Sequence, residues 1–506
     1  MLMHELLIRG AECHPDKLAF RWVDRDRSVT YAEAVAGMER FAGAFAHLGV
    51  TPGERVTIVA HNGLDYLLSM FGAWRIGAIA AMVSVRFVDD LAYYFGDHEP
   101  AVIVYTHDVH DAVAAAAGMT ASVRHLVCMD GPKEGAHALP ELIEAAFPPP
   151  PDPSDEDAIA HLSYTSGTTG LPKGACLAHE PTIRATRCIG ERLQITSDDV
   201  SFGPTALSSS YQLVGNLLPQ LDRMASINVM GKWSAASGFD ALAQAGATML
   251  IANPPVLGEV LAEARARGER PGRLRMSLSG GGPVPPTLKA AWRDELGIPL
   301  VESYGQSELG GFVALGFPRL GDDPPGETRI GPQLPDKEVQ VVGPNDETLP
   351  LGETGELVIR GGFMKGYWGK PDKTAEVTRG GWLHTGDIGV MDRDRFITMR
   401  GRRSELIEVG GQRWYPRDVE EALARQEGVV LAALVGVPDE RLGSRPVAFV
   451  TVGEGYSPDI DQLKRAVAEE TPYDAGPLDV RVVAEMPMTP TGKIAKAELA
   501  ARARGT

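Results

Sequence analysis

The amino-acid sequence predicts an α/β protein, with a large N-terminal domain of α/β layers that includes a β-rich subregion and a small C-terminal α+β domain. Strand-like and helix-like segments alternate up to about Leu300, as they do when helices pack on a parallel or mixed sheet. The stretch from Gly310 to Gly355 is rich in glycine, proline and acidic residues and contains short strand-like runs. A compact set of helix and strand patterns then follows residue 400.

The N-terminal alternation begins with clear local signals. Thr30 and Glu33 have the spacing of a helical capping box, and apolar residues recur at helical spacing up to Gly49, a typical C-terminal stop. The run "ERVTIVA" then predicts a strand. The apolar stretch from Tyr66 to Val85 is interrupted by Arg75, so it predicts a buried helix and a buried strand rather than a membrane span.

The clearest domain boundary lies near residue 400. The proline- and acid-rich spacer Phe147 to Asp157 need not be a boundary, because the strand pattern "AIAHLSYTS" follows it at once. Further on, "PRDVEEALARQ" predicts a helix, "VVLAALVGV" and "RPVAFVTV" predict strands, and Ser457 and Pro458 begin another helix. We therefore expect an N-terminal domain over residues 1–400 and a C-terminal domain over residues 401–506.

Composition argues against several classes of function. The formal net charge is −18, so neither nucleic acid nor an anionic membrane surface is an expected partner. Four cysteines form no CxxC pair and have no accompanying histidine cluster, namely Cys13, Cys128, Cys176 and Cys188. This favours reduced thiols in the cytoplasm over a disulfide framework or a zinc site. The N-terminal residues lack the pattern of a signal peptide. The sequence is compatible with either a monomer or a homodimer.

The stretch "YTSGTTGLPKGA", residues 164–175, has two interpretations. On composition alone it is a flexible surface loop. Alternatively it is a phosphate cradle, because glycines let backbone N–H groups approach an anion, hydroxyls add donors and Lys173 adds positive charge. It is not a Walker A loop, since Pro172 precedes Lys173 and Gly174 follows it.

This loop resembles the signature loop of the adenylate-forming superfamily, which contains acyl-CoA synthetases, nonribosomal adenylation domains and firefly luciferase. Further segments resemble the other motifs of the superfamily and follow in its order over essentially the whole chain. They are "SGGGPV" (279–284), "SYGQSELG" (303–310), "GETGELVIRG" (352–361), "GWLHTGDIG" (381–389), "GRRSELIEVGG" (401–411) and "PTGKI" (490–494).

The resemblance implies an AMP-forming acyl- or aryl-CoA ligase. Such an enzyme activates a carboxylic acid with Mg²⁺ and ATP to acyl-AMP and pyrophosphate, and then transfers the acyl group to coenzyme A. The alternative is an adenylation-only enzyme that passes acyl-AMP to a partner enzyme or carrier protein. A luciferase-like oxygenase shares the motifs, whereas a non-catalytic nucleotide-binding module would be expected to have lost Lys493, Glu308 or the phosphate loop, all of which are present.

The resemblance also assigns residues to ATP. The Gly280–Gly282 backbone and the Tyr304 ring are expected to enclose adenine, Asp387 to accept hydrogen bonds from the ribose, and Arg402 to contact ribose or phosphate unless it forms an interdomain salt bridge. The full set is Thr165, Ser166, Gly167, Thr168, Thr169, Gly170, Lys173, Gly280, Gly281, Gly282, Glu302, Ser303, Tyr304, Gly305, Ser307, Asp387 and Arg402.

Two residues are expected to be catalytic. Glu308 would hold Mg²⁺, a hard cation that prefers oxygen ligands. Lys493 in "PTGKI" would stabilise the negative charge that develops at the α-phosphate. Because Lys493 lies far along the chain from the phosphate loop, the resemblance implies a mobile C-terminal domain that closes to deliver it.

The second half of the reaction matches the family less well. Gly410 and Gly411 match the segment that lines the tunnel for the coenzyme A thiol. The hinge position, usually Asp or Lys, is Ser404 here, and Glu408 stands where Lys is common. Trp414 stands where a smaller residue is usual, and its indole either narrows the path of the thiol or packs between the domains.

The acyl pocket is expected from the segment 201–218 and the glycines that follow Glu308. Leu207 replaces a histidine that is usual in the family, and "SYQLVGN" resembles the aromatic-acid ligases, in which a tyrosine corresponding to Tyr211 lies near the acyl chain. Small residues leave space, namely Ala206, Ser208, Ser209, Ser210, Gly310 and Gly311. The pocket therefore predicts a bulky hydrophobic acid that is aromatic, alicyclic or long-chain.

Overall fold

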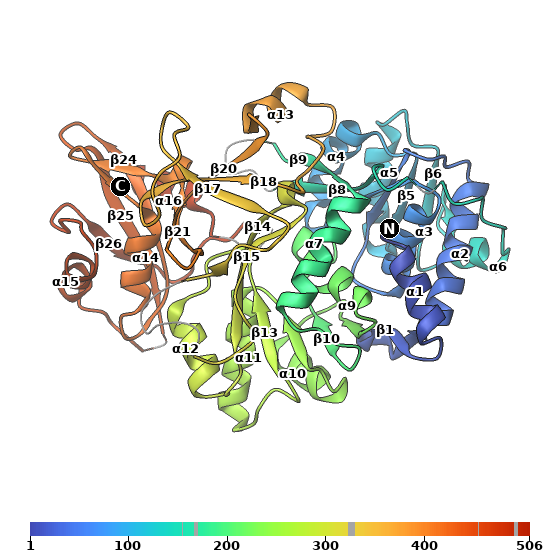
Figure 1. Ribbon diagram of the computed structural model, residues 1–506, viewed down its shortest axis with the longest axis horizontal. Helices are drawn as coiled ribbons and strands as arrows, with labels where there is room; N and C mark the ends of the chain where they lie inside the picture. Colours follow the sequence, from blue (N-terminus) through green and yellow to red (C-terminus); the bar gives the residue numbers. More distant parts are fainter. Residues whose placement is uncertain (154, 166–170, 322–328, 454, 490–493, 506) are drawn as a thin grey trace.

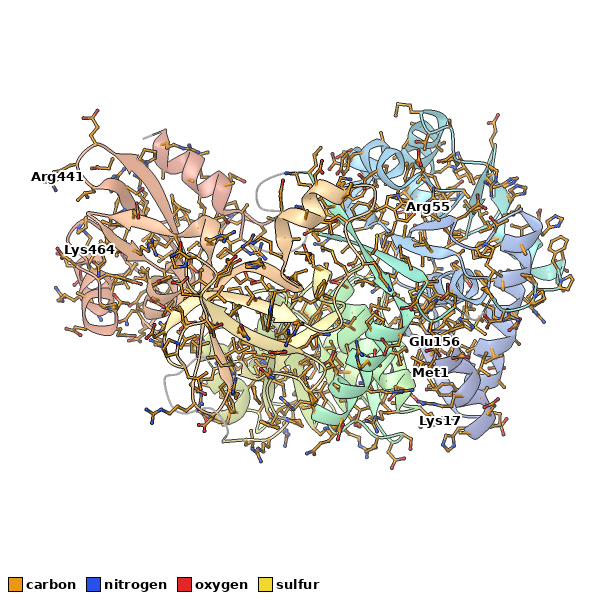
Figure 2. All side chains as sticks on the ribbon, turned by 45° about the horizontal axis from the view of Figure 1, so that its top comes forward. Met1, Lys17, Arg55, Glu156, Arg441 and Lys464 are labelled. Carbon is orange, nitrogen blue, oxygen red and sulfur yellow. The ribbon has the colours of Figure 1, made fainter. Side chains whose placement is uncertain are left out.

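The computed structural model describes residues 1–153, 155–165, 171–321, 329–453, 455–489 and 494–505. Among these residues, the long strands form four sheets. Figure 1 shows the first elements of the chain (blue to cyan) at one end of the molecule, α10, α11 and α12 (green to yellow-green) in its lower middle, and the C-terminal elements α14, α15 and α16 (orange to red) at the other end. Figure 2 shows Met1 beside Glu156, whose carboxylate pairs with the N-terminal ammonium, and shows Arg441 and Lys464 at the opposite end.

The first sheet carries the hairpin on which the glycine-rich loop sits. Its neighbouring strands are parallel except for the antiparallel pair β8–β9. In spatial order they are β7 (His137–Ala138), β6 (His125–Cys128), β5 (Val102–Tyr105), β3 (Arg55–Val59), β4 (Ile79–Met82), β8 (Ile159–Thr165) and β9 (Lys173–Ala178).

The second sheet has a parallel centre and an antiparallel strand at each edge. In spatial order its strands are β15 (Gly311–Leu315), β14 (Leu300–Gln306), β13 (Met276–Ser279), β12 (Met249–Ile251), β10 (Val200–Gly203), β11 (Ser226–Val229), β1 (Leu18–Trp22) and β2 (Arg27–Thr30). Central strands such as β11 and β12 are buried along their whole length, as expected for strands covered on both faces.

Helices fill the space between these two sheets and cover their outer faces. One apolar cluster between the sheets contains residues of α2, α3, α7 and α9, a second packs α10, α11 and α12 on the eight-stranded sheet, and a third packs α4 and α5 on the seven-stranded sheet. The helices of this part are α1 (Glu5–Cys13), α2 (Tyr31–His47), α3 (Leu64–Arg75), α4 (Leu91–His98), α5 (His110–Gly118), α6 (Leu139–Glu144), α7 (His179–Arg192), α8 (Ser210–Gln212), α9 (Leu218–Asp222), α10 (Ala235–Gln244), α11 (Pro254–Arg267) and α12 (Pro286–Asp294).

The predicted β-rich subregion is an antiparallel sheet that extends further along the chain than the glycine- and proline-rich stretch did. Its strands are β16 (Gly331–Pro332), β21 (Phe396–Arg402), β20 (Trp382–Met391), β18 (Thr354–Arg360) and β17 (Glu338–Val342), with β19 (Thr378–Arg379) beside β20 and helix α13 (Pro371–Val377) before it. Pairing of β20 with β21 continues to Asp387 and Arg402. The boundary after residue 400 stays a prediction, and strand pairing in this sheet runs two residues past it.

In its described residues, the C-terminal unit is a mixed sheet with three helices. Its elements are β22 (Ile407–Val409), β23 (Gln412–Trp414), α14 (Pro416–Ala424), β24 (Val429–Asp439), β25 (Gly443–Val452), α15 (Ile460–Glu470), β26 (Asp479–Val482) and α16 (Lys496–Arg504). The α/β class with a smaller C-terminal α+β unit is confirmed. The helix predicted from Ser457 and Pro458 begins later, at Ile460, because the Asp459 side chain accepts the N–H groups of Asp461 and Gln462 and caps it.

Several local predictions are confirmed. The Thr30 hydroxyl accepts the N–H of Glu33 and the Glu33 carboxylate accepts the N–H of Thr30, which is the capping box of α2. Gly49 has a φ of +76° just after this helix, a conformation in which glycine is favoured. All four cysteines are unpaired. Within the described ranges, no helix has the length and apolarity needed to cross a bilayer.

Candidate functional site

The glycine-rich loop connects the two strands of the β8–β9 hairpin. Thr165, the last residue of β8, is the cross-strand partner of Lys173, the first residue of β9. The predicted phosphate-binding residues Ser166, Gly167, Thr168, Thr169 and Gly170 lie outside the described residues. The hairpin therefore positions the two ends of the loop next to each other, at the edge of the sheet where strand β8 ends.

Helix α4 holds both ends of this loop. The Tyr164 hydroxyl donates to Asp97 Oδ2 at 2.8 Å, and the Asp97 carboxylate also pairs with Lys370. The Tyr93 hydroxyl, one helical turn before Asp97, donates to the Pro172 carbonyl. A loop that is rich in glycine is thus attached to a rigid element by hydrogen bonds just outside it.

Glu308 lies in a one-turn 3₁₀ helix, Ser307–Leu309, that follows strand β14 directly. Its Oε1 accepts a hydrogen bond from the Tyr367 hydroxyl at 2.7 Å. Lys173 Nζ lies 4.8 Å from the centre of the Tyr367 ring, within the range of a cation–π contact. One tyrosine therefore contacts both the loop lysine and the carboxylate, two groups that the sequence places in separate motifs.

A second group of polar side chains surrounds Asp387 on β20. Its Oδ2 accepts hydrogen bonds from the Tyr304 hydroxyl at 2.9 Å and from Gln306 Nε2 at 2.6 Å. Its Oδ1 pairs with Arg402 Nε at 3.2 Å. Burial and the Asp387 carboxylate raise the pKa of Tyr304 well above its usual value, so this hydroxyl is a proton donor. Arg402 and Asp387 are cross-strand partners, so their ion pair joins the adjacent strands β20 and β21 of one sheet.

The glycines 280–282 leave an open surface next to this group. A Cβ atom on Gly281 or on Gly282 would meet no atom within 4 Å, whereas one on Gly280 would lie 2.3 Å from Ser303 Oγ. The Ser303 hydroxyl donates to the Ser279 carbonyl at 3.0 Å. The backbone is thus bare on one side and tightly packed on the other, as the expected contact with a flat base requires.

Glu302 makes an unexpected contact. It is buried in β14, and its Oε1 pairs with Arg417 Nη2 of α14 at 3.3 Å, while Lys289 Nζ of α12 lies 3.6 Å from Oε2. Arg417 also pairs with Glu421 at 2.6 Å. Burial lowers the pKa of Arg417, but the two carboxylates outweigh it and raise this pKa above its usual value. Glu302, expected at ATP, therefore connects β14 to the C-terminal unit.

The residues expected around the acyl group differ in how far they are buried. Tyr211 is half-buried, its hydroxyl donates to the Leu278 carbonyl at 2.8 Å, and its ring lies 5.8 Å from that of Phe312. The hydroxyls of Ser210 and Ser307 lie 3.1 Å apart. A Cβ atom on Gly311 would meet Ala185 of α7, and one on Gly305 would meet the Gly311 carbonyl. Gly310 ends the 3₁₀ helix just before Gly311. Leu207 is buried in the apolar cluster between the two sheets, and Tyr211 packs against the same cluster.

The predicted C-terminal residues are also spread out. Gly410 and Gly411 form the exposed turn between β22 and β23, with φ of +58° and +84°. Trp414 is only 1% exposed and stacks on Tyr473, with ring centres 4.7 Å apart. It packs in the apolar cluster of the C-terminal unit instead of between domains. Lys493 lies outside the described residues.

Ser404 is exposed and stands between two anchored neighbours. Arg403 Nη1 pairs with Glu356 Oε2 of β18 at 2.7 Å. Glu405 Oε2 pairs with Lys496 Nζ of α16 at 2.8 Å. The residue before Ser404 is thus attached to the antiparallel sheet of the N-terminal part, and the residue after it to the C-terminal unit.

Tyr367, Gln306 and Arg417 were not predicted from the sequence. Gln306 stands inside the "SYGQSELG" motif, so its amide was a findable candidate. Tyr367 and Arg417 carry no local signal, because their partners are distant in the chain and only the folded arrangement reveals them.

The donors near Glu308 suit Mg²⁺. In the described part of the chain, no group of three or more histidine, cysteine, aspartate or glutamate side chains is arranged to hold a metal ion. Mg²⁺ is typically held by one or two carboxylates together with substrate phosphates and water. A single carboxylate, with Oε1 fixed by Tyr367 and hydroxyl groups beside it, fits that pattern.

Comparison with known proteins agrees with this geometry. The profile of the AMP-binding enzyme family matches residues 7–368, and that of the AMP-binding enzyme C-terminal domain matches residues 418–493. A feruloyl-CoA synthase from an Amycolatopsis species is 31% identical, over 98% of each chain. A sulfoacetate–CoA ligase from Cupriavidus necator is 29% identical, over 98% of this chain and 96% of its own.

A solved structure has the same fold. The anthranilate CoA ligase AuaEII in complex with anthranoyl-AMP superposes with a TM-score of 0.92 at 24% identity, over 99% of this chain and 97% of that one.

Proposed function

The chain belongs to the family of AMP-binding enzymes and is an AMP-forming acid–CoA ligase that uses ATP, Mg²⁺ and coenzyme A, and on this premise we propose that its acid is aromatic or otherwise bulky and hydrophobic. The carboxylate oxygen attacks the α-phosphorus of ATP, the bond to the β-phosphate breaks, and pyrophosphate leaves. The thiol of coenzyme A then attacks the acyl carbonyl, loses its proton, and AMP leaves.

The observation that carries the adenylation step is that charged groups from separate motifs lie in contact. Lys173, Tyr367 and Glu308 form one connected set, and Tyr304, Asp387 and Arg402 form another. An anion must attack a polyanion in this reaction, so catalysis depends mainly on positioning and charge neutralisation. We assign the loop 165–170 and Lys173 to the phosphates and Glu308 to Mg²⁺.

The nucleoside would lie across β13, β14 and β20. We assign adenine to the bare backbone of Gly280–Gly282 and the Tyr304 ring, with Glu302, Ser303, Gly305 and Ser307 shaping that wall. Asp387 would accept the ribose hydroxyls, and Arg402, its present ion-pair partner, would contact ribose or phosphate. Because Asp387 already accepts bonds from Tyr304 and Gln306, its carboxylate has a fixed orientation before the nucleotide arrives.

The C-terminal unit would supply Lys493 to the α-phosphate and then turn about Ser404. Support for the pivot comes from its neighbours, since Arg403 is paired with Glu356 and Glu405 with Lys496. We accordingly propose that the chain divides into domains of residues 1–400 and 401–506. The backbone of Ser404, just after this boundary, would be the flexible point. After rotation, the turn of Gly410 and Gly411 would line the path of the thiol.

The acid would lie next to Tyr211, with Ser210, Gly310 and Gly311 leaving room for a ring. The similarity to a feruloyl-CoA synthase supports an aromatic acid, whereas the sulfoacetate–CoA ligase is named for a small polar one. We place the reaction in the cytoplasm, which the four unpaired cysteines support.

The test is a mass-spectrometric assay of acyl-AMP and acyl-CoA with Mg²⁺-ATP, with and without coenzyme A. The acids would be ferulate, benzoate, cyclohexanecarboxylate, octanoate, sulfoacetate and acetate. We expect both products with an aromatic acid and little with acetate. Strict preference for acetate or sulfoacetate would refute the assignment of the pocket. Acyl-AMP that accumulates without acyl-CoA would instead favour an adenylation-only enzyme with a downstream acyl-transfer partner, which the departures at Ser404, Glu408 and Trp414 keep open.

A further inference from the structure

Tyr367 is a buried tyrosine fixed from several sides. It is 6% exposed, its backbone N–H donates to Thr374 Oγ1 of α13 at 2.9 Å, and it forms an isolated bridge with Ala175 of β9. Its ring therefore stands beside the strand that begins at Lys173. Fixation by backbone contacts on both sides leaves the direction of the hydroxyl well defined.

The hydroxyl can act only as a donor toward Glu308. An ionised carboxylate has no hydrogen to donate, so the phenol is the donor of this hydrogen bond. Glu308 Oε1 accepts this hydrogen bond from the Tyr367 hydroxyl at 2.7 Å. The described residues provide no hydrogen bond to Glu308 Oε2, which leaves this oxygen for another ligand.

The ring of Tyr367 also separates two opposite charges. Lys173 Nζ lies over the ring at 4.8 Å, and no ion pair joins Lys173 to Glu308 in the described part of the structure. A lysine and a glutamate with nothing between them tend to neutralise each other. Here the ring face holds the ammonium and the hydroxyl holds the carboxylate, so both charges stay available.

We propose that Tyr367 is a positioning residue of the adenylation step, which orients Glu308 for Mg²⁺ and keeps Lys173 apart from that carboxylate so that it meets phosphate. This inference rests on the proposed function, because it assigns the two charges to the metal and the triphosphate. It predicts that the hydroxyl and the ring have separable effects. Loss of the hydroxyl weakens metal binding, and loss of the ring weakens nucleotide binding as well.

The test measures binding of Mn²⁺ by electron paramagnetic resonance, with and without α,β-methylene ATP, in Tyr367→Phe, Tyr367→Leu and the control Tyr31→Phe. Tyr31 is also buried, and its hydroxyl donates to the Ala225 carbonyl at 2.8 Å, away from the site. We expect Tyr367→Phe to weaken Mn²⁺ binding in the presence of the analogue about tenfold, as for a lost hydrogen bond to a charged group, and to keep the metal-free affinity for the analogue. Tyr367→Leu should also weaken that metal-free affinity, and Tyr31→Phe should change neither.

A second variant keeps the inference testable if Tyr367→Phe is unstable. Glu308→Asp withdraws the carboxylate from the hydroxyl by one methylene, so it should weaken Mn²⁺ binding to a similar extent, and Tyr367→Phe should add little in that background. Full additivity of the two changes, or a Tyr367→Phe protein that binds Mn²⁺ like wild type, would overturn the inference. A wild-type protein that forms no acyl-AMP with any acid would instead refute the proposed function, while the metal-binding data stay informative.

Discussion

The nucleotide region and the C-terminal unit are organised in different ways. In the nucleotide region, Asp387 is held by Tyr304 and Gln306 of β14 and by Arg402 of β21. In the C-terminal unit, the glycine turn at 410–411 is exposed, and Trp414 is turned into the unit's own core. Charge-assisted hydrogen bonds therefore fix the side chains of the first region before a ligand binds. The second region instead exposes the backbone of a glycine turn, and ion pairs attach it to the N-terminal part.

The sharpest test of this contrast is removal of the lysine that the C-terminal unit is expected to deliver. Lys493→Ala should slow pyrophosphate release from acid and ATP about a hundredfold, roughly 3 kcal/mol, because one cationic contact to the developing charge is lost. Transfer from synthetic acyl-AMP to coenzyme A should stay near wild type, since that half does not use Lys493. Lys464→Ala, on the outer face of the same unit (Figure 2), is the matched control. Equal slowing of both halves would contradict the division of labour.

The contact between the two regions can be weakened at Arg417. Arg417→Met leaves the buried Glu302 with Lys289 at 3.6 Å and should lower the free energy of unfolding by about 2 kcal/mol, because a buried charge loses its partner. Denaturant unfolding measures this loss. Combining Arg417→Met with Glu302→Gln should recover most of the lost stability. The control Arg502→Met, which breaks the exposed pair with Glu498, should change stability by less than about 0.5 kcal/mol. A double variant as unstable as the single one would contradict the ion-pair explanation.

Acid should affect the two regions unequally, because all twelve histidines precede residue 385. Burial lowers the pKa of His98 to about 3 and that of His161 to about 4, from 6.5. Both are neutral in the folded protein and gain a proton on unfolding below pH 6.5, so their contribution destabilises the N-terminal part as pH falls from 6.5 toward these values. The loss should be about 1.4 kcal/mol per histidine for each pH unit.

Denaturant unfolding at about pH 7.5 and about pH 5.5 measures this slope, and hydrogen exchange locates it. Exchange of the C-terminal amides should change less than exchange of β8 and α4. The substitution His161→Gln should reduce the change of unfolding free energy with pH. The substitution of an exposed histidine, His14→Gln, should leave that change as it is in the wild type. An unchanged slope in His161→Gln would contradict the assignment.

Local sequence signals predicted what depends on neighbours in the chain. The capping box at Thr30, the strand before the glycine-rich loop and the α/β class all follow from periodicity and turn residues. The start of α15 was misplaced because Ser457, Pro458 and Asp459 all precede it, and hydrogen-bond geometry alone identifies Asp459 as the cap. The inward packing of Trp414 on Tyr473 and the contact of Arg417 with Glu302 depend on partners 59 and 115 residues away, which no local pattern contains.

Lys496 also touches a second carboxylate, since its Nζ lies 2.8 Å from both Glu405 Oε2 and Glu420 Oε1. One ammonium near the end of the chain thus ties the residue after Ser404 to helix α14 and stands three positions beyond Lys493. Rotation about Ser404 would therefore move α14, α16 and the segment that precedes Lys496 together as one rigid body. A truncation that removed α16 would leave the Glu405 and Glu420 carboxylates without the Lys496 ammonium between them. It would also break the connection between α14 and the residue after the pivot.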